Sequence, residues 1–494
     1  MRRDPGQHVP WWPPLPHAAA GRARLLAIDE AGVLTASDGR VWHPATYAEW
    51  LQVARTEKLC VYTDDLDGWP HFQEADRDPR ASLALSGARG ILGWRFTGGP
   101  RGIHVWLLNA RMAWGPAFRP TGDAIRTLVT LHERAGLPVG SCRSAAAFGQ
   151  AVWAQGWGRR DRVSAPRFVC RQAMARHGIG GRVDFWADPG RTYDRVWEID
   201  LTAAYAACSQ RLPTGTGIGL SARRTEVRMW RGDGQVVDFG PDWDDHWTST
   251  DTWWRRCQVT IPAGGLRCPG PFPVRDPSGR VRYPTSAGTH ETWLWREEAE
   301  DCREVGATVE PGEGWGWSLD PTPEFAQRML TLRRSSGRAG PLVKLATVAA
   351  IGRFGVRSET WTSHPVAEME PGDVVSTVTA TGQLGPCSLR RSPDRSRGSL
   401  THWHQYVQMQ ARRRLWHRVC AELHAGTVIL STNYDAILCA TMPQGPLGDE
   451  LGAWHLQTWT AARLRVPRWL EAAETSKTPG RPRPGPAEPR PVAA

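Results

Sequence analysis

Two apolar segments that each run into an aspartate constrain this chain more than any other feature. Val196-Trp197-Glu198-Ile199 precedes Asp200, and an Ala-rich, helix-like stretch over 202–212 follows and stops at Pro213. Residues 427–432 and 436–439 flank a turn at Asn433-Tyr434, with Asp435 at or beside its tip. The pattern predicts a strand that ends at Asp200 and a β-hairpin that carries Asp435.

Carboxylates at strand ends can converge at one edge of a sheet. There Asp200 and Asp435 could hold two Mg²⁺ ions and leave room for water and phosphate as the remaining ligands, which is the arrangement that phosphoryl transfer needs. A single aspartate in such a place is more often an ordinary turn or N-cap residue. The order of further motifs along the chain therefore has to decide between the two interpretations.

The size and charge of the chain narrow its class. With 494 residues, 40% hydrophobic and 22% charged, we expect two to four folded units. No apolar run is long enough to span a bilayer, and Met1-Arg2-Arg3-Asp4-Pro5 opens no secretory signal, so we expect a cytoplasmic protein without a membrane partner. The ten cysteines form no C-x-x-C pair and do not cluster with histidine, which favours a reducing compartment.

The net charge points to a polyanion. Lys and Arg number 61 against 50 Asp and Glu, giving a formal charge of +11. Nucleic acid is the usual partner of such a chain, and a basic surface without a function is the alternative. Only three of the basic residues are lysines, Lys58, Lys344 and Lys477.

Periodicity gives a coarse order of elements. In the first 160 residues, apolar runs predict strands at 25–28, 59–62 and 103–108 and a helix over 124–135, which makes a small α/β unit. Farther on, Gly180-Gly181 precedes an alternating stretch at 182–186, and short strand-like runs fill 255–320. Helices are predicted from Pro323 to about Ser335, from Pro341 to near Gly352, over 401–423 and over 451–473.

Three motifs in order resemble those of family B DNA polymerases, above all the protein-primed type found in phages, linear plasmids and organelles. Residues 200–206 resemble the first palm motif, D-x-x-S-L-Y-P, and keep its Asp and Tyr. Residues 344–355 resemble the fingers motif, K-x-x-x-N-S-x-Y-G, and keep its Lys and Gly. Residues 431–436 resemble the third motif, Y-x-D-T-D-S, with Asn433 in place of the first Asp, and Gly180-Gly181 lies where the family has its Y-x-G-G linker.

The resemblance implies an α+β multidomain fold: a right-hand polymerase of palm, fingers and thumb, preceded by a shortened ribonuclease-H-like exonuclease-type α/β domain. The implied boundaries are an irregular segment at 1–22, the exonuclease-like domain at 23–164, the polymerase domain at 165–474 and a disordered Pro- and Arg-rich tail at 475–494. Within the polymerase domain, the palm covers about 165–320 and 356–440, the fingers about 321–355 and the thumb about 441–474.

The resemblance also implies roles for single residues. Asp200 and Asp435 are the catalytic metal ligands for two Mg²⁺ ions, or Mn²⁺, with the Leu201 carbonyl as a third ligand. Tyr205 lies under the incoming sugar and rejects a ribose hydroxyl, although its ring could equally be a core aromatic. The nucleotide triphosphate is bound by a set that the fingers motif and the preceding helix supply: Lys344, Gly352, Arg333 and Arg334.

An exonuclease of this family needs about four carboxylates, and the N-terminal region supplies them incompletely. Asp65 and Asp67 could replace its D-x-E, Asn109 fits the start of its second motif, and Asp123 fits the end of its third. The second-motif Asp is missing, and Arg119 stands where a Tyr is expected. We therefore expect an exonuclease-like fold with a degraded site, and Asp65 and Asp67 are otherwise a solvated acidic turn.

The leading hypothesis is a template-directed DNA polymerase that serves the replication of a phage or linear plasmid. Its expected partners are primer-template DNA, deoxynucleoside triphosphates and a terminal protein primer. The alternative is a catalytically degenerate, DNA-binding relative, because Val348, Ala349 and Ile351 replace the Asn, Ser and Tyr of the fingers motif. A nuclease that uses the N-terminal acids is the weaker third hypothesis.

Overall fold

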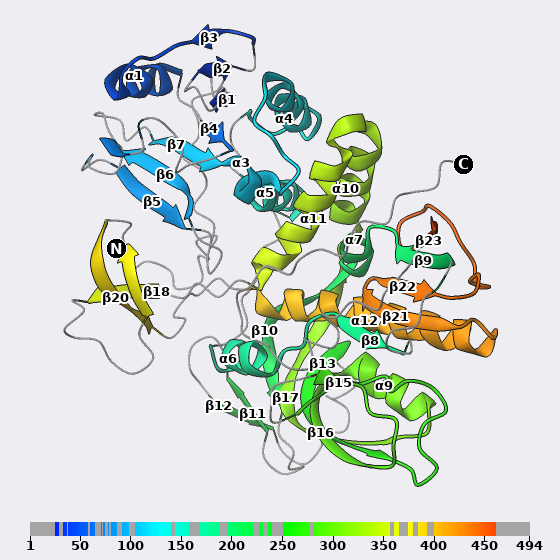
Figure 1. Ribbon diagram of the computed structural model, residues 1–494. Helices are drawn as coiled ribbons and strands as arrows, with labels where there is room; N and C mark the ends of the chain where they lie inside the picture. The colour runs from blue at the N-terminus through cyan, green and yellow to red at the C-terminus, as the bar shows by residue number, and fades with distance from the viewer. Residues whose placement is uncertain are drawn as a thin grey trace. The chain divides into compact units, whose positions relative to one another are not determined.

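The structure is a computed structural model in which the following residues are described: 25–28, 33–36, 38–57, 60–64, 71, 73–74, 78, 81–85, 91–97, 104–139, 144–157, 168–186, 193, 195–220, 227–230, 236–239, 250–276, 281–355, 360–364, 374–378, 384–392 and 400–460. The chain forms two compact units (Figure 1). Unit 1 comprises 1–160 and 328–399, and unit 2 comprises 161–327 and 400–494. No helix in the described part is long and apolar enough to cross a membrane.

Unit 1 is built on a seven-stranded sheet in the order β3-β2-β1-β4-β7-β6-β5. Strands β1, β4 and β7 are parallel, whereas the other pairs are antiparallel. The strands are β1 (Leu25–Ile28), β2 (Leu34–Ala36), β3 (Val41–Trp42), β4 (Cys60–Thr63), β5 (Ala81–Leu85), β6 (Ile91–Thr97) and β7 (His104–Asn109). The three strands predicted in this region are confirmed as β1, β4 and β7.

Helices of unit 1 accompany this sheet, and a small sheet in the order β18-β20-β19 completes the described elements. The elements are α1 (Tyr47–Glu57), α3 (Ala110–Trp114), α4 (Gly122–Arg134), α5 (Ala145–Trp157), η2 (Gly337–Ala339), α11 (Gly340–Phe354), β18 (Thr360–His364), β19 (Val374–Val378) and β20 (Leu384–Ser392). The predicted helix over 124–135 is confirmed as α4, which begins where the Thr121 hydroxyl accepts a hydrogen bond from the Ala124 amide. Helix α10 (Pro323–Ser335), also predicted, runs across the boundary between the two units.

Helix α11 lies directly on α5 (Figure 1). A Cβ added at Gly149 of α5 would stand 2.3 Å from the carbonyl oxygen of Ala346, so only glycine permits this approach. The rings of Trp153 and Phe354 meet edge to face at 5.2 Å farther along the contact. The buried face of α11 is thereby fixed against α5 within unit 1.

Unit 2 holds an antiparallel five-stranded sheet in the order β23-β9-β22-β21-β8. The strands are β8 (Arg182–Phe185), β9 (Arg195–Leu201), β21 (Ile429–Tyr434), β22 (Ala436–Cys439) and β23 (Trp454–Thr460). Helix α12 (Thr401–His424) packs on it through Leu415 and Val419, which join Ile199 and Ile437 in one buried cluster. The predicted strand at Asp200, the hairpin at Asp435 and the long helix before it are confirmed.

Two predicted helices in unit 2 are wrong, and tertiary pairing explains both. The helix after Asp200 is only α7 (Ala204–Cys208), because Arg211 already starts β10 (Arg211–Leu220). The helix predicted over 451–473 is wrong at 454–460, where β23 forms the sheet edge beside β9. Trp454 and Leu456 pack on the buried cluster with the two-residue period of a strand. Residues 461–473 and both terminal segments lie outside the described residues.

A second sheet of unit 2, in the order β10-β17-β13-β16, is antiparallel and carries helix α9 (Arg296–Glu304) on one face. Its other strands are β13 (Thr252–Ile261), β16 (Gly288–Trp295) and β17 (Thr308–Pro321), which confirms strands in 255–320. The remaining described elements of unit 2 are α6 (Phe168–His177), β11 (Val227–Trp230), β12 (Val236–Phe239), β14 (Val274–Arg275) and β15 (Val281–Arg282).

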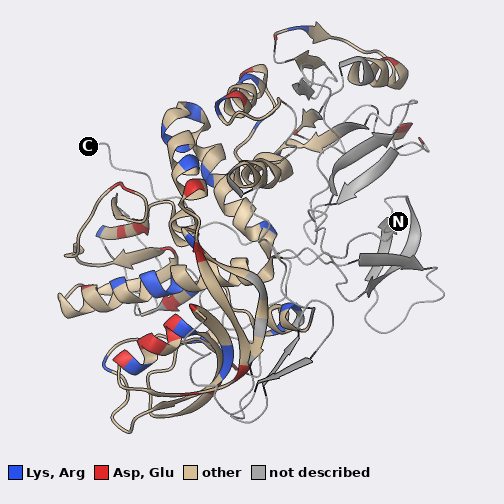
Figure 2. Cartoon of the chain, turned by 180° about the vertical axis from the view of Figure 1, so that it is seen from behind, with Lys and Arg blue, Asp and Glu red and all other residues tan. Residues whose placement is uncertain are grey.

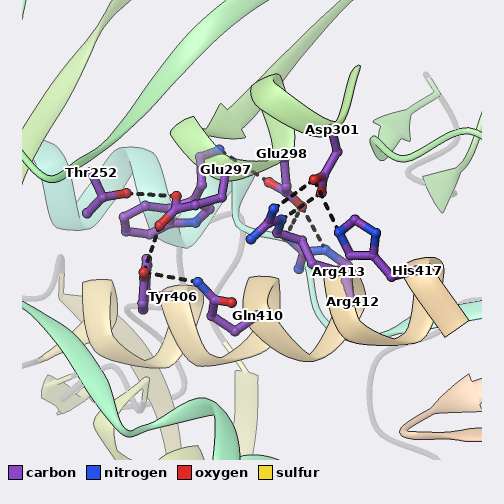
Figure 3. Close-up of polar contacts among 10 residues, drawn as sticks. Thr252, Glu297, Glu298, Asp301, Tyr406, Gln410, Arg412, Arg413 and His417 are labelled. Atoms are coloured by element: carbon purple, nitrogen blue, oxygen red, sulfur yellow. Dashed lines mark hydrogen bonds and ion pairs between the residues drawn. The ribbon is translucent and has the colours of Figure 1, made fainter. Parts of the chain in front are cut away.

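Charged side chains join α9 to α12. Figure 2 shows basic segments of α12 beside acidic segments of α9, and Figure 3 shows the contacts. Arg412 is 4% exposed and pairs at 2.7 Å with Glu298, which is fully buried. Arg413 binds Asp301 with two hydrogen bonds of 2.6 and 2.7 Å, and His417 approaches the same carboxylate at 3.3 Å. Such pairs offset the cost of burying each charge alone.

Arg412 also reaches the segment that holds the Gly180-Gly181 pair. Its Nη1 donates hydrogen bonds to the carbonyls of Ile179 (2.7 Å) and Gly180 (2.8 Å). A planar guanidinium can serve the Glu298 carboxylate and these two carbonyls at once. The position of residues 179–181 is thus set by a buried ion pair.

We expect Asp301→Asn to lower the free energy of unfolding by about 2 kcal/mol at pH 7, since it removes one charge from a buried, hydrogen-bonded pair. Burial alone raises the pKa of Asp301, but hydrogen bonds from Arg413 and His417 outweigh it and hold the pKa below its ordinary 3.8. A lowered pKa stabilises the fold above the unfolded-state pKa, and this is lost as the pH falls through the folded-state pKa. The difference between wild type and variant should therefore shrink below about pH 4.

Urea denaturation at pH 7 and at pH 3.5 measures this difference. Glu300→Gln is the matched control, because Glu300 lies on the same helix but pairs with Arg296 while 48% exposed. A variant difference that does not change between the two pH values would contradict the assigned role of Asp301.

Candidate active site

The register of the five-stranded sheet brings Asp200 and Asp435 to neighbouring positions. Asp200 on β9 pairs with Ala436, the residue directly after Asp435, on β22. The Leu201 amide donates a hydrogen bond to the carbonyl of Asp435 at 2.9 Å. The turn between strands β21 and β22 is so short that Asn433 pairs with Ala436. Two aspartates that lie 235 positions apart in the sequence thus share one sheet edge.

Backbone strain marks the same place. Among the described residues, only two that are not glycine have a left-handed backbone, Ala203 (φ 50°) and Tyr434 (φ 59°). Ala203 is three residues after Asp200, and Tyr434 directly precedes Asp435. The Asp435 amide donates to the Asn433 carbonyl at 2.8 Å, which closes a three-residue turn around Tyr434. Such conformations cost roughly 1–3 kcal/mol each and are concentrated at functional sites.

The ring of Tyr434 rests on Gly181. A Cβ added at Gly181 would stand 2.1 Å from Cδ1 of Tyr434 and 2.9 Å from two other ring atoms. Tyr434 also pairs with Arg182 between β21 and β8. Gly181 is therefore needed because a side chain there would occupy the place of the aromatic ring that precedes Asp435.

Other side chains surround the two aspartates. His455 on β23 pairs with Asp200 from the side opposite to Ala436, and its imidazole approaches Asp449 at 2.7 Å. Tyr205 is partly buried, and its hydroxyl accepts a hydrogen bond of 3.4 Å from Gln408. Burial raises the pKa of Tyr205, and the charge of Asp435 raises it further, so the phenol stays protonated near the carboxylate.

Burial raises the pKa of the Cys208 thiol on α7 to about 12, with Asp435 adding to the rise and Arg414 opposing it. Because the Asp435 carboxylate raises the pKa of both Tyr205 and Cys208, Asp435 lies beside α7 as well as beside β9. Asp435 is thereby set among residues of the first motif.

The donor set fits hard cations only in an open coordination sphere. In the described part of the chain, no group of three or more His, Cys, Asp or Glu side chains could hold a metal ion. Asp200 and Asp435 supply carboxylate oxygens, which Mg²⁺ prefers. An ion bound to these two groups would have to complete its shell with backbone oxygen, water or a phosphate ligand, as catalytic Mg²⁺ sites do.

The predicted triphosphate ligands lie on helices α10 and α11. Lys344, Val348 and Gly352 follow one another at four-residue spacing along the exposed face of α11, and Val348 is 40% exposed. An added Cβ at Gly352 would meet no atom within 4 Å, so this face is open there. Arg333 is half-buried and Arg334 is exposed in the last turn of α10.

Of the predicted exonuclease residues, the structure describes Asn109 and Asp123. Asp65 and Asp67 lie outside the described residues. The side chain of Asn109 caps helix α3 by accepting a hydrogen bond from the Met112 amide at 3.0 Å. Asp123, in the first turn of α4, is 83% exposed and pairs with Arg126. Asn109 therefore has a local structural role.

Two arginines gather at the end of β4. Arg111 and Arg119 approach the Asp64 carboxylate at 3.3 and 3.5 Å, and Asp64 is the residue directly before Asp65. Arg111 follows Asn109, near the position where the Asp of the second exonuclease motif is missing. Arg119 stands where the third motif has a Tyr. Guanidinium groups here supply the positive charge that a metal ion would otherwise bring, and they would repel one.

Some of these features could not be read from the sequence. Tyr434, His455 and Arg412 carried no signal of their own, since each depends on strand register or on a helix contact between distant segments. Gly181 did carry a signal, because a Gly-Gly pair before a strand indicates a close backbone approach, although its partner could not be named.

Comparison with solved structures gives the fold. Phi29 DNA polymerase in a ternary complex with primer-template DNA and incoming nucleotides matches over 88% of this chain and 85% of its own, with a TM-score of 0.59 and 12% identity. The same polymerase in an orthorhombic crystal form matches over 87% and 81%, with a TM-score of 0.55 and 14% identity. The binary complex of this polymerase with primer-template DNA matches over 89% of this chain and 85% of its own, with a TM-score of 0.57 and 12% identity.

The chain therefore has a polymerase-like, multidomain α+β fold. The fold class predicted from the sequence is confirmed at this level. No family model and no curated protein matches the chain.

We expect Gly181→Ala to destabilise unit 2 by about 2–3 kcal/mol, because the added methyl group displaces the Tyr434 ring. In a Tyr434→Asn background the same change should cost much less, since the ring is gone and Asn tolerates a left-handed backbone. A double-mutant cycle by urea denaturation should give a coupling energy above about 1 kcal/mol.

Gly180→Ala is the matched control for this cycle, because a Cβ there would meet no atom within 4 Å. If the effects of Gly181→Ala and Tyr434→Asn simply add, the two residues do not form the contact described above.

Proposed function

We propose that the protein is a template-directed DNA polymerase that transfers deoxynucleotides to a primer 3′ hydroxyl. The observation that carries this proposal is the pairing of β9 with β22, which brings Asp200 and Asp435 together beside the two left-handed residues of the described part. The likeness of fold to Phi29 DNA polymerase supports it. The three motifs support it independently, because they were identified from the sequence without reference to that fold.

In this proposal Asp200 and Asp435, with the Leu201 carbonyl, would hold two Mg²⁺ ions, or Mn²⁺. When bound, such ions stabilise the attacking and leaving oxygens of an in-line phosphoryl transfer. The chain's own contribution is to fix the two carboxylates. The hydrogen bond from Leu201 to Asp435 and the turn around Tyr434 hold both backbones, so little reorganisation is needed when substrate binds.

The ring of Tyr205 would lie under the incoming sugar. It follows Asp200 by five residues on α7, and Gln408 of α12 fixes its hydroxyl. A ring held in this way can exclude a ribose 2′-hydroxyl by its bulk. On α11, Lys344 and the open backbone at Gly352 would bind the triphosphate, assisted by Arg333 and Arg334 of α10.

The arrangement of palm, fingers and thumb belongs to this proposal, as do the partners. Primer-template DNA and deoxynucleoside triphosphates are the proposed substrates, and a terminal protein is the proposed primer of replication in a phage or linear plasmid. The alternative is a DNA-binding relative without catalysis. Val348, exposed on the same face of α11 as Lys344, favours that alternative because it replaces a polar residue of the fingers motif.

The N-terminal sheet would be the remnant of a ribonuclease-H-like exonuclease. Its order β3-β2-β1-β4-β7, in which β4 and β7 run parallel to β1, supports this assignment. Asp64 lies at the end of β4 between Arg111 and Arg119, so this edge of the sheet carries fixed positive charge. We infer that the domain retains its fold and lacks proofreading activity.

Wild type should extend a primer in the presence of Mg²⁺, and Asp200→Ala or Asp435→Ala should each reduce the rate by about 1000-fold or more, since each removes a charge that stabilises the transition state. DNA binding, measured by fluorescence anisotropy, should persist. Asp320→Ala on β17 is the control. Full activity of either variant would exclude the two-carboxylate site, and an inactive wild type that binds DNA would favour the noncatalytic alternative.

Tyr205→Ala should admit ribonucleotides while it leaves deoxynucleotide insertion largely intact. Tyr205→Phe should behave like wild type, because the ring and not the hydroxyl excludes the sugar. Single-nucleotide insertion with matched deoxy- and ribonucleotides measures the ratio of kcat/KM values. If Tyr205→Ala discriminates as well as wild type does, the ring has only a packing role.

A single-stranded 3′ end incubated with Mg²⁺ or Mn²⁺, without nucleotides, should remain intact. A two-metal exonuclease needs its complete set of carboxylates. Of the predicted carboxylates, the structure describes Asp123, which pairs with Arg126, and the neighbouring Asp64 is bound by Arg111 and Arg119. Gel analysis of a labelled oligonucleotide over several hours provides the measurement. Rapid degradation that disappears in Asp65→Ala would show that the N-terminal unit is an active proofreader.

A further inference from the structure

A cluster of stacked rings lies on the second sheet of unit 2, away from the two aspartates in the sequence. Trp254 of β13 stacks on Trp293 of β16, with ring centroids 4.1 Å apart and planes at 23°. Trp315 of β17 stacks on both, at 6.0 Å from Trp254 and 5.9 Å from Trp293. His177, the last residue of α6, stacks on Trp293 at 5.6 Å. We call these four residues the aromatic platform.

The platform continues a row of rings that is buried at its other end. Trp254 pairs directly with both Trp295 and Trp315, so the three side chains lie on one face of the sheet. Trp295 is 1% exposed because the Tyr406 ring of α12 packs on it at 5.0 Å. Trp293, two residues before Trp295 on the same strand, and Trp315 are only partly buried. Large aromatic rings thus emerge from the core at the protein surface.

The strand next to Trp315 leaves space at its side. Gly219 of β10 is the direct partner of Trp315, and a Cβ added there would meet no protein atom within 4 Å. A glycine opposite a half-buried tryptophan gives up packing that almost any side chain would supply. This is the arrangement in which another flat group can lie beside the indole.

The charges around the platform are mainly positive. Burial is the largest cause that lowers the pKa of His177, and the exposed Arg176, Arg275 and Arg256 lie close enough to lower it further. Glu291 opposes them and forms an ion pair with Arg256, and Glu313 lies near Arg256 as well. His177 is therefore neutral at neutral pH and can stack as a neutral ring.

We propose that the aromatic platform is a binding site for single-stranded DNA, in which unpaired bases stack on Trp293 and Trp315 and the phosphates face Arg176 and Arg275. Partly exposed aromatic rings beside basic side chains are the combination by which proteins bind single strands without reading their sequence. Duplex DNA does not fit such a site, because its bases are already stacked on one another. The site does not depend on the proposed polymerase activity, since it needs neither metal ion nor nucleotide.

The test is the affinity of the full chain for a labelled oligothymidylate of 12 nucleotides, measured by fluorescence anisotropy without Mg²⁺ or nucleotides. Trp293→Ala and Trp315→Ala should each weaken binding by about tenfold, as is usual for the loss of one stacked base. Trp315→Phe should retain most of the affinity because a ring remains. Arg176→Ala should lower the slope of log affinity against log salt by about one unit.

Two controls separate stacking from general electrostatic attraction. Trp42→Ala removes another partly buried tryptophan, which lies in unit 1, and should leave the affinity unchanged. A blunt duplex of the same length should bind the wild type and the tryptophan variants equally. Unchanged affinity of Trp293→Ala and Trp315→Ala for the single strand, or an equal loss for single strand and duplex, would overturn the proposal.

A second measurement uses the wild-type chain and does not depend on the folding of any variant. An oligonucleotide in which 5-iododeoxyuridine replaces thymidine crosslinks on irradiation to the aromatic ring that it stacks on. Mass spectrometry of the digested product should find the adduct on a peptide that contains Trp293, Trp315 or His177. Adducts confined to other peptides would place the single strand elsewhere. Loss of primer extension in the aspartate variants tests the polymerase separately, because those variants should still form this crosslink.

Discussion

The buried guanidinium of Arg412 is the constraint on which the arrangement of unit 2 depends. A charge that is 4% exposed is tolerated only when its donors are satisfied, and here the partners come from two distant parts of the chain. Glu298 of α9 supplies the opposite charge, and Ile179 and Gly180 supply two carbonyls. The ion pair therefore joins α9, α12 and the segment before β8 into one body.

The same ion pair positions the residues that surround Asp435. Gly181 follows directly after the two bound carbonyls, and it carries the ring of Tyr434. Tyr434 in turn adopts a strained backbone directly before Asp435. Strain of this kind persists only where surrounding contacts over-determine the conformation. A chain of contacts thus runs from a buried salt bridge to the turn that carries one of the two proposed metal ligands, and each link is a short-range packing or hydrogen-bonding contact.

Carboxylates lie at the ends of two strands, one in each unit. At the end of β9, Asp200 pairs with Ala436 and the Leu201 amide binds the Asp435 carbonyl, so two aspartates meet at this strand end. At the end of β4, Asp64 is paired with two arginines. Since a fixed guanidinium neutralises a carboxylate and repels other cations, the end of β4 is unfavourable for a metal ion. The two ion pairs of Asp64 thus support the proposal that the N-terminal unit lacks proofreading activity.

The sequence alone determined the local elements that carry the two proposed metal ligands. Apolar runs ending in Asp200 and flanking Asp435 are strong strand signals, and the Pro323 and Pro341 signals set helices α10 and α11, because these depend on neighbouring residues only. The expectation of a degraded exonuclease site likewise rests on the sequence alone, because no acid follows Asn109 at the expected distance. Only the tertiary structure decided what distant segments do to each other. Residues 454–460 form a strand because they pair with β9. The helix after Asp200 ends before Arg211 because Arg211 pairs with β17. Gly181 is required because it contacts the ring of Tyr434, 253 positions away. Pairing and packing free energies of this kind exceed local helix propensity, so no reading of neighbouring residues could have supplied them.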